Sequence, residues 1–128
     1  MSGDANELIP YDIQLDLQKQ RTDDFKKLLL TLEVIDDKKK ILWAQIYEHA
    51  IEDRMNAYIL FTDLYINSRG KPSEHVENGP VLAKYIERMS RSNDQILKLA
   101  ELIQHAQEQE SSVKDEGDIF DQIKHKKG

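Results

Sequence analysis

The sequence predicts an all-α protein whose fold is a long antiparallel helical hairpin, resembling a coiled coil, with a short helix before it. Two segments, residues 37–67 and 80–109, carry apolar side chains at helical spacing, and a segment rich in glycine and proline separates them. The apolar arcs of both segments are wider than one partner helix can cover. We therefore expect the hairpins to assemble into a homo-oligomeric ring.

Composition excludes several classes of protein. The 24 acidic and 18 basic residues give a formal net charge of −6, which argues against a surface that binds nucleic acid everywhere and leaves room for a local basic patch. The absence of cysteine excludes a disulfide framework, a thiolate zinc site and a cysteine nucleophile. The sequence shows no signal peptide and no apolar run that could span a bilayer, so we expect a soluble intracellular protein with no membrane partner.

Residues 1–21 are polar, and we expect a flexible N-terminal arm there. Its alternating residues Ile13, Leu15 and Leu17 would also suit a short strand or a docking segment, although one strand is not stable by itself. A helical core over residues 22–109 follows. It begins with a short helix at 24–34, for which Thr22 or Asp23 can serve as the N-cap.

Two long helices complete the predicted core. Asp36 or Asp37 can cap the first, at residues 37–67, which contains neither glycine nor proline. The segment "RGKPSEHVENGP", residues 69–80, predicts a flexible hairpin tip, because it holds two glycines and two prolines. Pro80 suits the first position of the second helix, at residues 80–109.

The last segment, residues 110–128, predicts an acidic linker followed by a C-terminal docking tail. The part "QEQESSVKDEGD" is acidic and poor in apolar residues, and we expect it to be disordered. Beyond it, Ile119, Phe120 and Ile123 share one potential helical face. Three apolar residues cannot fold alone, so we interpret them as a partner-docking peptide.

Apolar residues cover roughly 220° of each long helix when successive residues are placed about 100° apart, whereas one neighbour hides only about 100°. Burying the surplus requires other subunits, and repeated contacts that close on themselves form a ring. The candidate interface residues are Trp43, Tyr47, Arg54, Tyr58, Phe61, Tyr85, Met89, Asn93, Leu99 and Leu102.

Two polar residues, Arg54 and Asn93, fall inside these apolar arcs. In one interpretation Arg54 extends its charged end to water and Asn93 forms a local hydrogen bond. In the other, both are buried and fix the register of the helices and the number of subunits. The sequence leaves both interpretations open.

Catalysis has little support in the sequence. The pairs His49 with Asp53 and Glu101 with His105 have the spacing of two metal ligands on a helix, but a usable site needs three or four. All four residues lie on or near polar faces. We expect no catalytic residue, no metal and no cofactor, and the hairpin tip has no phosphate-binding motif.

Small basic clusters recur along the chain. A ring would repeat each cluster around its circumference and create a belt of positive charge suited to DNA phosphates. The candidate DNA-binding residues are Lys26, Lys27, Lys38, Lys39, Lys40, Arg88 and Arg91. The first two groups of lysines flank a helix, a turn and a second helix start, which is also loosely typical of a helix-turn-helix DNA-binding regulator within residues 22–45.

The segment "RMSRSNDQILKLAELI", residues 88–103, resembles the second core helix of the small terminase subunit of T-even-like bacteriophages and related cyanophages. The similarity extends in layout to the preceding "AYILFTDLYINS", the polar hairpin tip and the acidic linker that leads to "DIFDQI". It covers residues 36–123. The longer hairpin tip and the short N-terminal arm depart from the family pattern, which puts sequence-specific DNA recognition in doubt.

The resemblance implies a non-enzymatic regulator of viral genome packaging in the cytoplasm of an infected bacterium. Members of this family form rings of helical hairpins, engage viral double-stranded DNA, and regulate the ATPase and nuclease of the large terminase subunit. The expected partners are further copies of the chain, the large subunit at the C-terminal docking tail, and weakly bound DNA. A dimeric coiled-coil adaptor is the main alternative.

Overall fold

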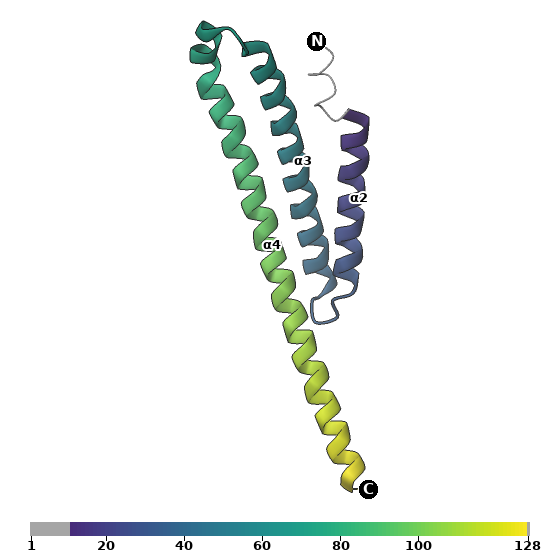
Figure 1. The fold of residues 1–128 in the computed structure, drawn as a ribbon. Coiled ribbons are helices and arrows are strands. Elements are labelled where there is room, and N and C mark those ends of the chain that lie inside the picture. The colour runs from purple at the N-terminus through teal and green to yellow at the C-terminus, as the bar shows by residue number, and fades with distance from the viewer. Residues whose placement is uncertain (1–10, 128) are drawn as a thin grey trace.

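The computed structural model describes residues 11–127, and it confirms the predicted all-α class. Three α-helices make up almost all of this part of the chain: α2 (Tyr11–Leu30), α3 (Asp37–Ser68) and α4 (Pro72–Lys127). No strand occurs within residues 11–127. Figure 1 shows α2 and α4 on either side of α3, with α4 extending far beyond the turn that joins α2 to α3.

Helix α2 begins much earlier than the sequence predicts. The expectation of a flexible arm or a short strand is wrong for residues 11–21, because these residues form the first half of the helix. Residues 1–10 of the predicted arm lie outside the described residues. The helix extends this far because Leu15 and Gln18 continue the spacing of its inner side chains, Thr22, Phe25 and Leu29.

Helix α3 matches the prediction to within one residue. Its N-cap is Asp36, whose carboxylate accepts a hydrogen bond from the Lys39 amide at 2.8 Å. Asp37 adds a negative charge in the first turn, where the helix dipole favours it. The helix ends at Ser68, next to the glycine at position 70, which has a positive φ of 77°.

The predicted hairpin tip is too long. Only residues 69–71 separate the helices, and α4 begins at Pro72 instead of Pro80. A proline at the first helical position loses no hydrogen bond, whereas Pro80 lies inside the helix. The Asn78 amide donates a hydrogen bond to the Ser68 hydroxyl at 3.0 Å, and this contact ties the start of α4 to the end of α3.

The predicted disorder after residue 109 is also wrong. Helix α4 continues without a break to Lys127, through the acidic segment and the docking tail. Glutamate, glutamine and lysine are good helix formers, so a low apolar content here indicates missing packing and not a missing helix. Every side chain from residue 111 to residue 124 is exposed, and we call this segment the α4 overhang.

In each of α3 and α4, one set of inner side chains follows a strict alternation of three and four residues. Such spacing places them in one seam between two helices that lie side by side. In α3 the seam comprises Lys40, Trp43, Tyr47, Ala50, Arg54, Ala57, Phe61, Leu64 and Ser68. In α4 it comprises Asn78, Leu82, Tyr85, Met89, Ser92, Ile96, Leu99, Ile103, Ala106 and Glu110.

The hydrophobic core lies beside the middle of α4, next to the turn that joins α2 to α3. All three helices contribute to it: the buried members are Phe25, Leu29, Leu32, Ala44, Leu99, Ile103 and Ala106. The Phe25 ring stacks on Tyr47 with the two ring centroids 4.1 Å apart. This core fixes the turn of residues 31–36 against the middle of α4.

Glu110 of α4 stabilises the same turn through its carboxylate. One of its oxygens accepts hydrogen bonds from the backbone amide of Glu33 and, at 2.9 Å, from that of Val34. We expect Glu110→Ala to lower the free energy of unfolding by about 1 kcal/mol, because two charge-assisted hydrogen bonds are lost at a solvent-accessible site. Urea unfolding measures this. The neighbouring Gln107→Ala should leave the midpoint unchanged, and equal midpoints for both variants would contradict the prediction.

Candidate interaction site

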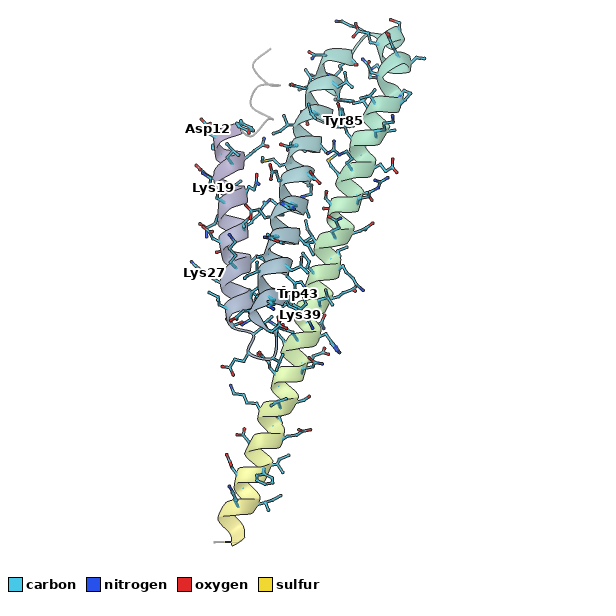
Figure 2. The ribbon with its side chains drawn as sticks, turned by 180° about the vertical axis from the view of Figure 1, so that it is seen from behind. Asp12, Lys19, Lys27, Lys39, Trp43 and Tyr85 are labelled. Carbon is cyan, nitrogen blue, oxygen red and sulfur yellow. The ribbon has the colours of Figure 1, made fainter. Side chains whose placement is uncertain are left out.

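The predicted lysine clusters lie near the α2–α3 turn, at the end of the paired helices α2 and α3. Lys26 from α2 and Lys40 from α3 line one groove between these helices, and Figure 2 shows Lys27 and Lys39 at the same end. The other lining residues are Leu29, Leu30, Ile41, Ala44, Gln45 and Glu48. We call this the α2–α3 groove. Its floor is apolar and lysines flank it.

The two predicted arginines lie elsewhere and already have acidic partners. Arg88 of α4 lies 3.9 Å from the carboxylate of Asp53 in α3, and both side chains are about half exposed. Arg91 forms an ion pair with Glu87 one turn earlier in α4, at 2.9 Å. The structure therefore brings the lysines together and separates the arginines from them.

Arg54 and Asn93 contact each other directly. The Arg54 guanidinium donates a hydrogen bond to the Asn93 amide oxygen at 2.8 Å, across the seam from α3 to α4. The interpretation of a local hydrogen bond at Asn93 is therefore wrong. Within one chain Asn93 is exposed and Arg54 is half-buried, so burial of the two residues between subunits stays a prediction. A directional polar contact between the two helices favours one register of the seam.

The other candidate interface residues divide into two groups. Leu99 is buried in the core, and Trp43, Tyr47 and Leu102 pack against the same core. These four residues therefore make contacts within one chain. Tyr58 is exposed, while Phe61, Tyr85 and Met89 are half-buried in the seam. The prediction of Leu99 as an interface residue is therefore wrong, because a side chain buried in the core of one chain has no surface left to contact a neighbour.

The structure adds exposed apolar residues that the site prediction missed. Leu60, Tyr65, Val81, Ile86 and Leu97 remain on the flanks of the seam, with Leu97 62% exposed. Around the α2–α3 turn, Leu30 and Ile41 are exposed beside the lysines. The flank residues lay in the predicted apolar arcs, but only the packing of the three helices decides which of them stay uncovered.

The predicted docking tail lies on the α4 overhang. Ile119, Phe120 and Ile123 are all exposed there, and Val113 is exposed one to three turns before them. The Lys124 ammonium lies 5.9 Å from the centre of the Phe120 ring, a cation–π contact at the surface. The structure thus presents these apolar side chains on a helix that is already formed.

Within residues 11–124, whose side chains the structure describes, no three or more metal-binding side chains gather into one group. Of the four residues with ligand spacing, Asp53 faces Arg88 instead, and His49, Glu101 and His105 are exposed.

The arrangement of α2 and α3 differs from that of a DNA-binding helix-turn-helix. In that motif the two helices cross at about 90–120°, so that the second can enter the major groove. Here α2 lies alongside α3 (Figure 1), and residues of both helices, among them Gln14, Leu17, Ile51 and Tyr58, line one groove. This geometry disfavours the helix-turn-helix alternative.

Comparisons with known proteins give no match. No family model matches the chain, and no similar sequence was found among curated proteins and no similar fold among solved structures. Within the described residues, no helix is long and apolar enough to cross a membrane.

Proposed function

We propose that the protein is a non-catalytic ring subunit of a viral genome-packaging machine, equivalent to the small terminase subunit that its sequence resembles. In this proposal α3 and α4 form the antiparallel coiled-coil hairpin from which the ring is built. One observation carries the assembly: six large apolar or aromatic side chains on the flanks of the hairpin stay at least 40% exposed. They are Tyr58, Leu60, Tyr65, Val81, Ile86 and Leu97.

Exposed apolar area of this extent favours association. Fully burying one such side chain contributes roughly 1.5–3 kcal/mol, so partial burial of several in each contact gives a substantial driving force. Both long helices carry these residues, which means that one hairpin can pack its α3 flank against the α4 flank of the next. A contact between two different faces repeats from copy to copy and closes into a ring when the rotation allows it.

Native mass spectrometry at micromolar concentration tests the assembly. We expect one large, discrete oligomer for the unchanged chain. Leu97→Glu should weaken it at least about tenfold, because the contact would then bury a carboxylate without a partner. Lys84→Glu is the matched control, since this exposed residue points about 140° away from Leu97 on the same helix and should leave the oligomer intact.

A monomer for the unchanged chain would overturn the ring. A dimer with no effect on DNA mobility would instead favour the coiled-coil adaptor. Loss of the oligomer in Lys84→Glu but not in Leu97→Glu would place the contact on another face of α4.

DNA binding in this proposal depends on the lysines around the α2–α3 turn. We expect the triple change of Lys38, Lys39 and Lys40 to glutamate to lower the affinity for duplex DNA and to flatten its salt dependence. Each lost phosphate contact reduces the logarithmic slope by about 0.9. Arg91→Gln is the control, because Arg91 already pairs with Glu87. Gel-shift titrations at several salt concentrations measure the affinity and its salt dependence. An equal loss of DNA affinity in the two variants would contradict the prediction.

Contact with the large terminase subunit is the remaining part of the proposal. The resemblance assigns this contact to the C-terminal docking tail, and the exposure of Ile119, Phe120 and Ile123 supports a docking role. A ring of such tails would regulate the large subunit by binding to it and would catalyse no reaction itself. Stimulation of the large subunit's ATPase by the full chain, lost when the tail is changed, is the expected result.

A further inference from the structure

One side of α4 carries a row of acidic residues. Asp94, Glu101 and Glu108 are seven residues apart, and all three are exposed. When successive residues are placed about 100° apart, these three side chains and Leu97 fall within one arc of about 60°. No other residue from 94 to 108 lies in this arc, so no basic side chain interrupts it. We call these four residues the acidic row.

The acidic row has charge available for a partner outside the chain. Lys98, which borders the row, lies 4.0 Å from the Glu101 carboxylate, but both side chains are exposed, so water screens this pair. Asp94 and Glu108 form no ion pair with any residue from 11 to 124. Leu97 adds an apolar side chain that is 62% exposed.

The α2–α3 groove has the opposite charge. Lys26 and Lys40 line it, and neither forms an ion pair within the described part of the chain. Its floor includes Leu30, which is 75% exposed, and Ile41, which is 60% exposed, and both would gain from a cover. Glu48 is the one acidic side chain among the residues that line this groove.

The acidic row cannot occupy the groove of its own chain. Residues of α2 and α3 alone line the groove. The row lies on the side of α4 that faces away from the seam with α3, as the exposure of its members shows. An occupant of this kind must come from another molecule.

The acidic row and the groove lie at the same height along the hairpin. The hydrogen bond between Arg54 and Asn93 joins α3 and α4 at one height. From this hydrogen bond toward the α2–α3 turn, Lys40 lies about 21 Å along α3, and Glu108 lies about 22 Å along α4. Lys40 and Glu108 are therefore level with each other.

Lys26 and Glu101 are level in the same way. Lys26 follows Phe25, whose ring stacks on Tyr47. Tyr47 lies about 10 Å along α3 from the same hydrogen bond, and Glu101 lies about 12 Å from it along α4. Two copies side by side at one height would thus bring Glu101 opposite Lys26 and Glu108 opposite Lys40.

We propose that the acidic row of one copy docks at the α2–α3 groove of a neighbouring copy. This inference rests on the proposed ring, in which hairpins stand side by side, and it names two surfaces that meet there. Their charges are complementary, and a helix in an apolar groove is a common mode of recognition. The two surfaces are different, so the contact is head-to-tail and repeats around the ring.

A charge swap in the full chain tests the contact. Lys26→Glu should weaken the oligomer at least about tenfold, because it places like charges opposite each other in every contact of the ring. Adding Glu101→Lys should restore the oligomer, since the complementarity is then reversed on both sides. Native mass spectrometry over a range of concentrations measures both effects.

Lys27→Glu is the matched control for this swap. Lys27 is exposed next to Lys26 but does not line the groove, so the oligomer should persist. Equal losses for Lys26→Glu and Lys27→Glu overturn the assignment of the groove. A loss that Glu101→Lys does not repair overturns the assignment of the acidic row.

Crosslinking locates the contact directly. The chain has no cysteine, so Gln45→Cys in the groove and Gln104→Cys beside the acidic row introduce its only two thiols. A short bis-maleimide should join neighbouring copies into a covalent ladder on a denaturing gel. The control pair combines Gln45→Cys with Gln95→Cys, which is exposed about 180° from Gln104 on α4 and should give no ladder.

Native mass spectrometry of the crosslinking samples separates the two proposals. A discrete oligomer with a ladder only for the first pair supports the docking. A discrete oligomer whose ladder is no stronger than the control overturns the docking and leaves the ring intact, including a groove that binds only DNA or a different protein. A monomer without a ladder overturns both.

Discussion

Ala50→Asp is expected to lower the free energy of unfolding by more than about 4 kcal/mol and to separate α3 from α4. Ala50 has no exposed surface, and it lies in the middle of the seam beside Arg54 and Ala57. A carboxylate at this position would lose its hydration in a close-packed contact that has no space for it, and the nearest cation, Arg54, already donates its hydrogen bond to Asn93. Thermal unfolding followed by circular dichroism measures the loss.

Ala83→Asp is the matched control for this change. Ala83 is exposed on α4, so the same substitution there costs only the difference in helix propensity between alanine and aspartate, about 0.6 kcal/mol. Similar losses for the two variants would show that the seam at Ala50 is open to water. That result would contradict the close packing of α3 on α4.

The sequence predicts α3 well because everything that defines this helix is local. Asp36 caps it, the segment contains no glycine or proline, and Gly70 follows its last residue closely. The opposite holds for the first half of α2 and for the overhang. There the polar composition suggested a flexible arm and a linker, whereas helix propensity and the anchoring contacts of Glu110 favour a helix.

The sequence identifies the individual residues of the candidate site, but it does not show which of them lie next to one another. Arg54 and Asn93 are conspicuous as polar residues in apolar arcs, yet their pairing depends on where the chain turns between α3 and α4. The predicted tip of residues 69–80 would allow several registers of α4 against α3. The observed turn of residues 69–71 is short and fixes one register. Likewise, only the turn between α2 and α3 brings Lys26 and Lys40 to one groove.

Leu32→Ala is expected to lower the free energy of unfolding by about 2–5 kcal/mol, the usual range for a leucine removed from a core. Leu32 is 1% exposed and belongs to the cluster in which all three helices meet, although it lies in the turn and not in a helix. A cavity there would loosen the turn that Glu110 also holds.

The control for Leu32 is Leu42→Ala, at a half-exposed leucine near the start of α3. It removes the same atoms from a site that water already reaches, so we expect a loss below about 1 kcal/mol. Urea unfolding of both variants decides between two views of the turn. If Leu32→Ala is no more costly than Leu42→Ala, residues 31–36 are an ordinary surface loop. If it is far more costly, the turn is part of the core, and the wall that it forms beside the α2–α3 groove is rigid.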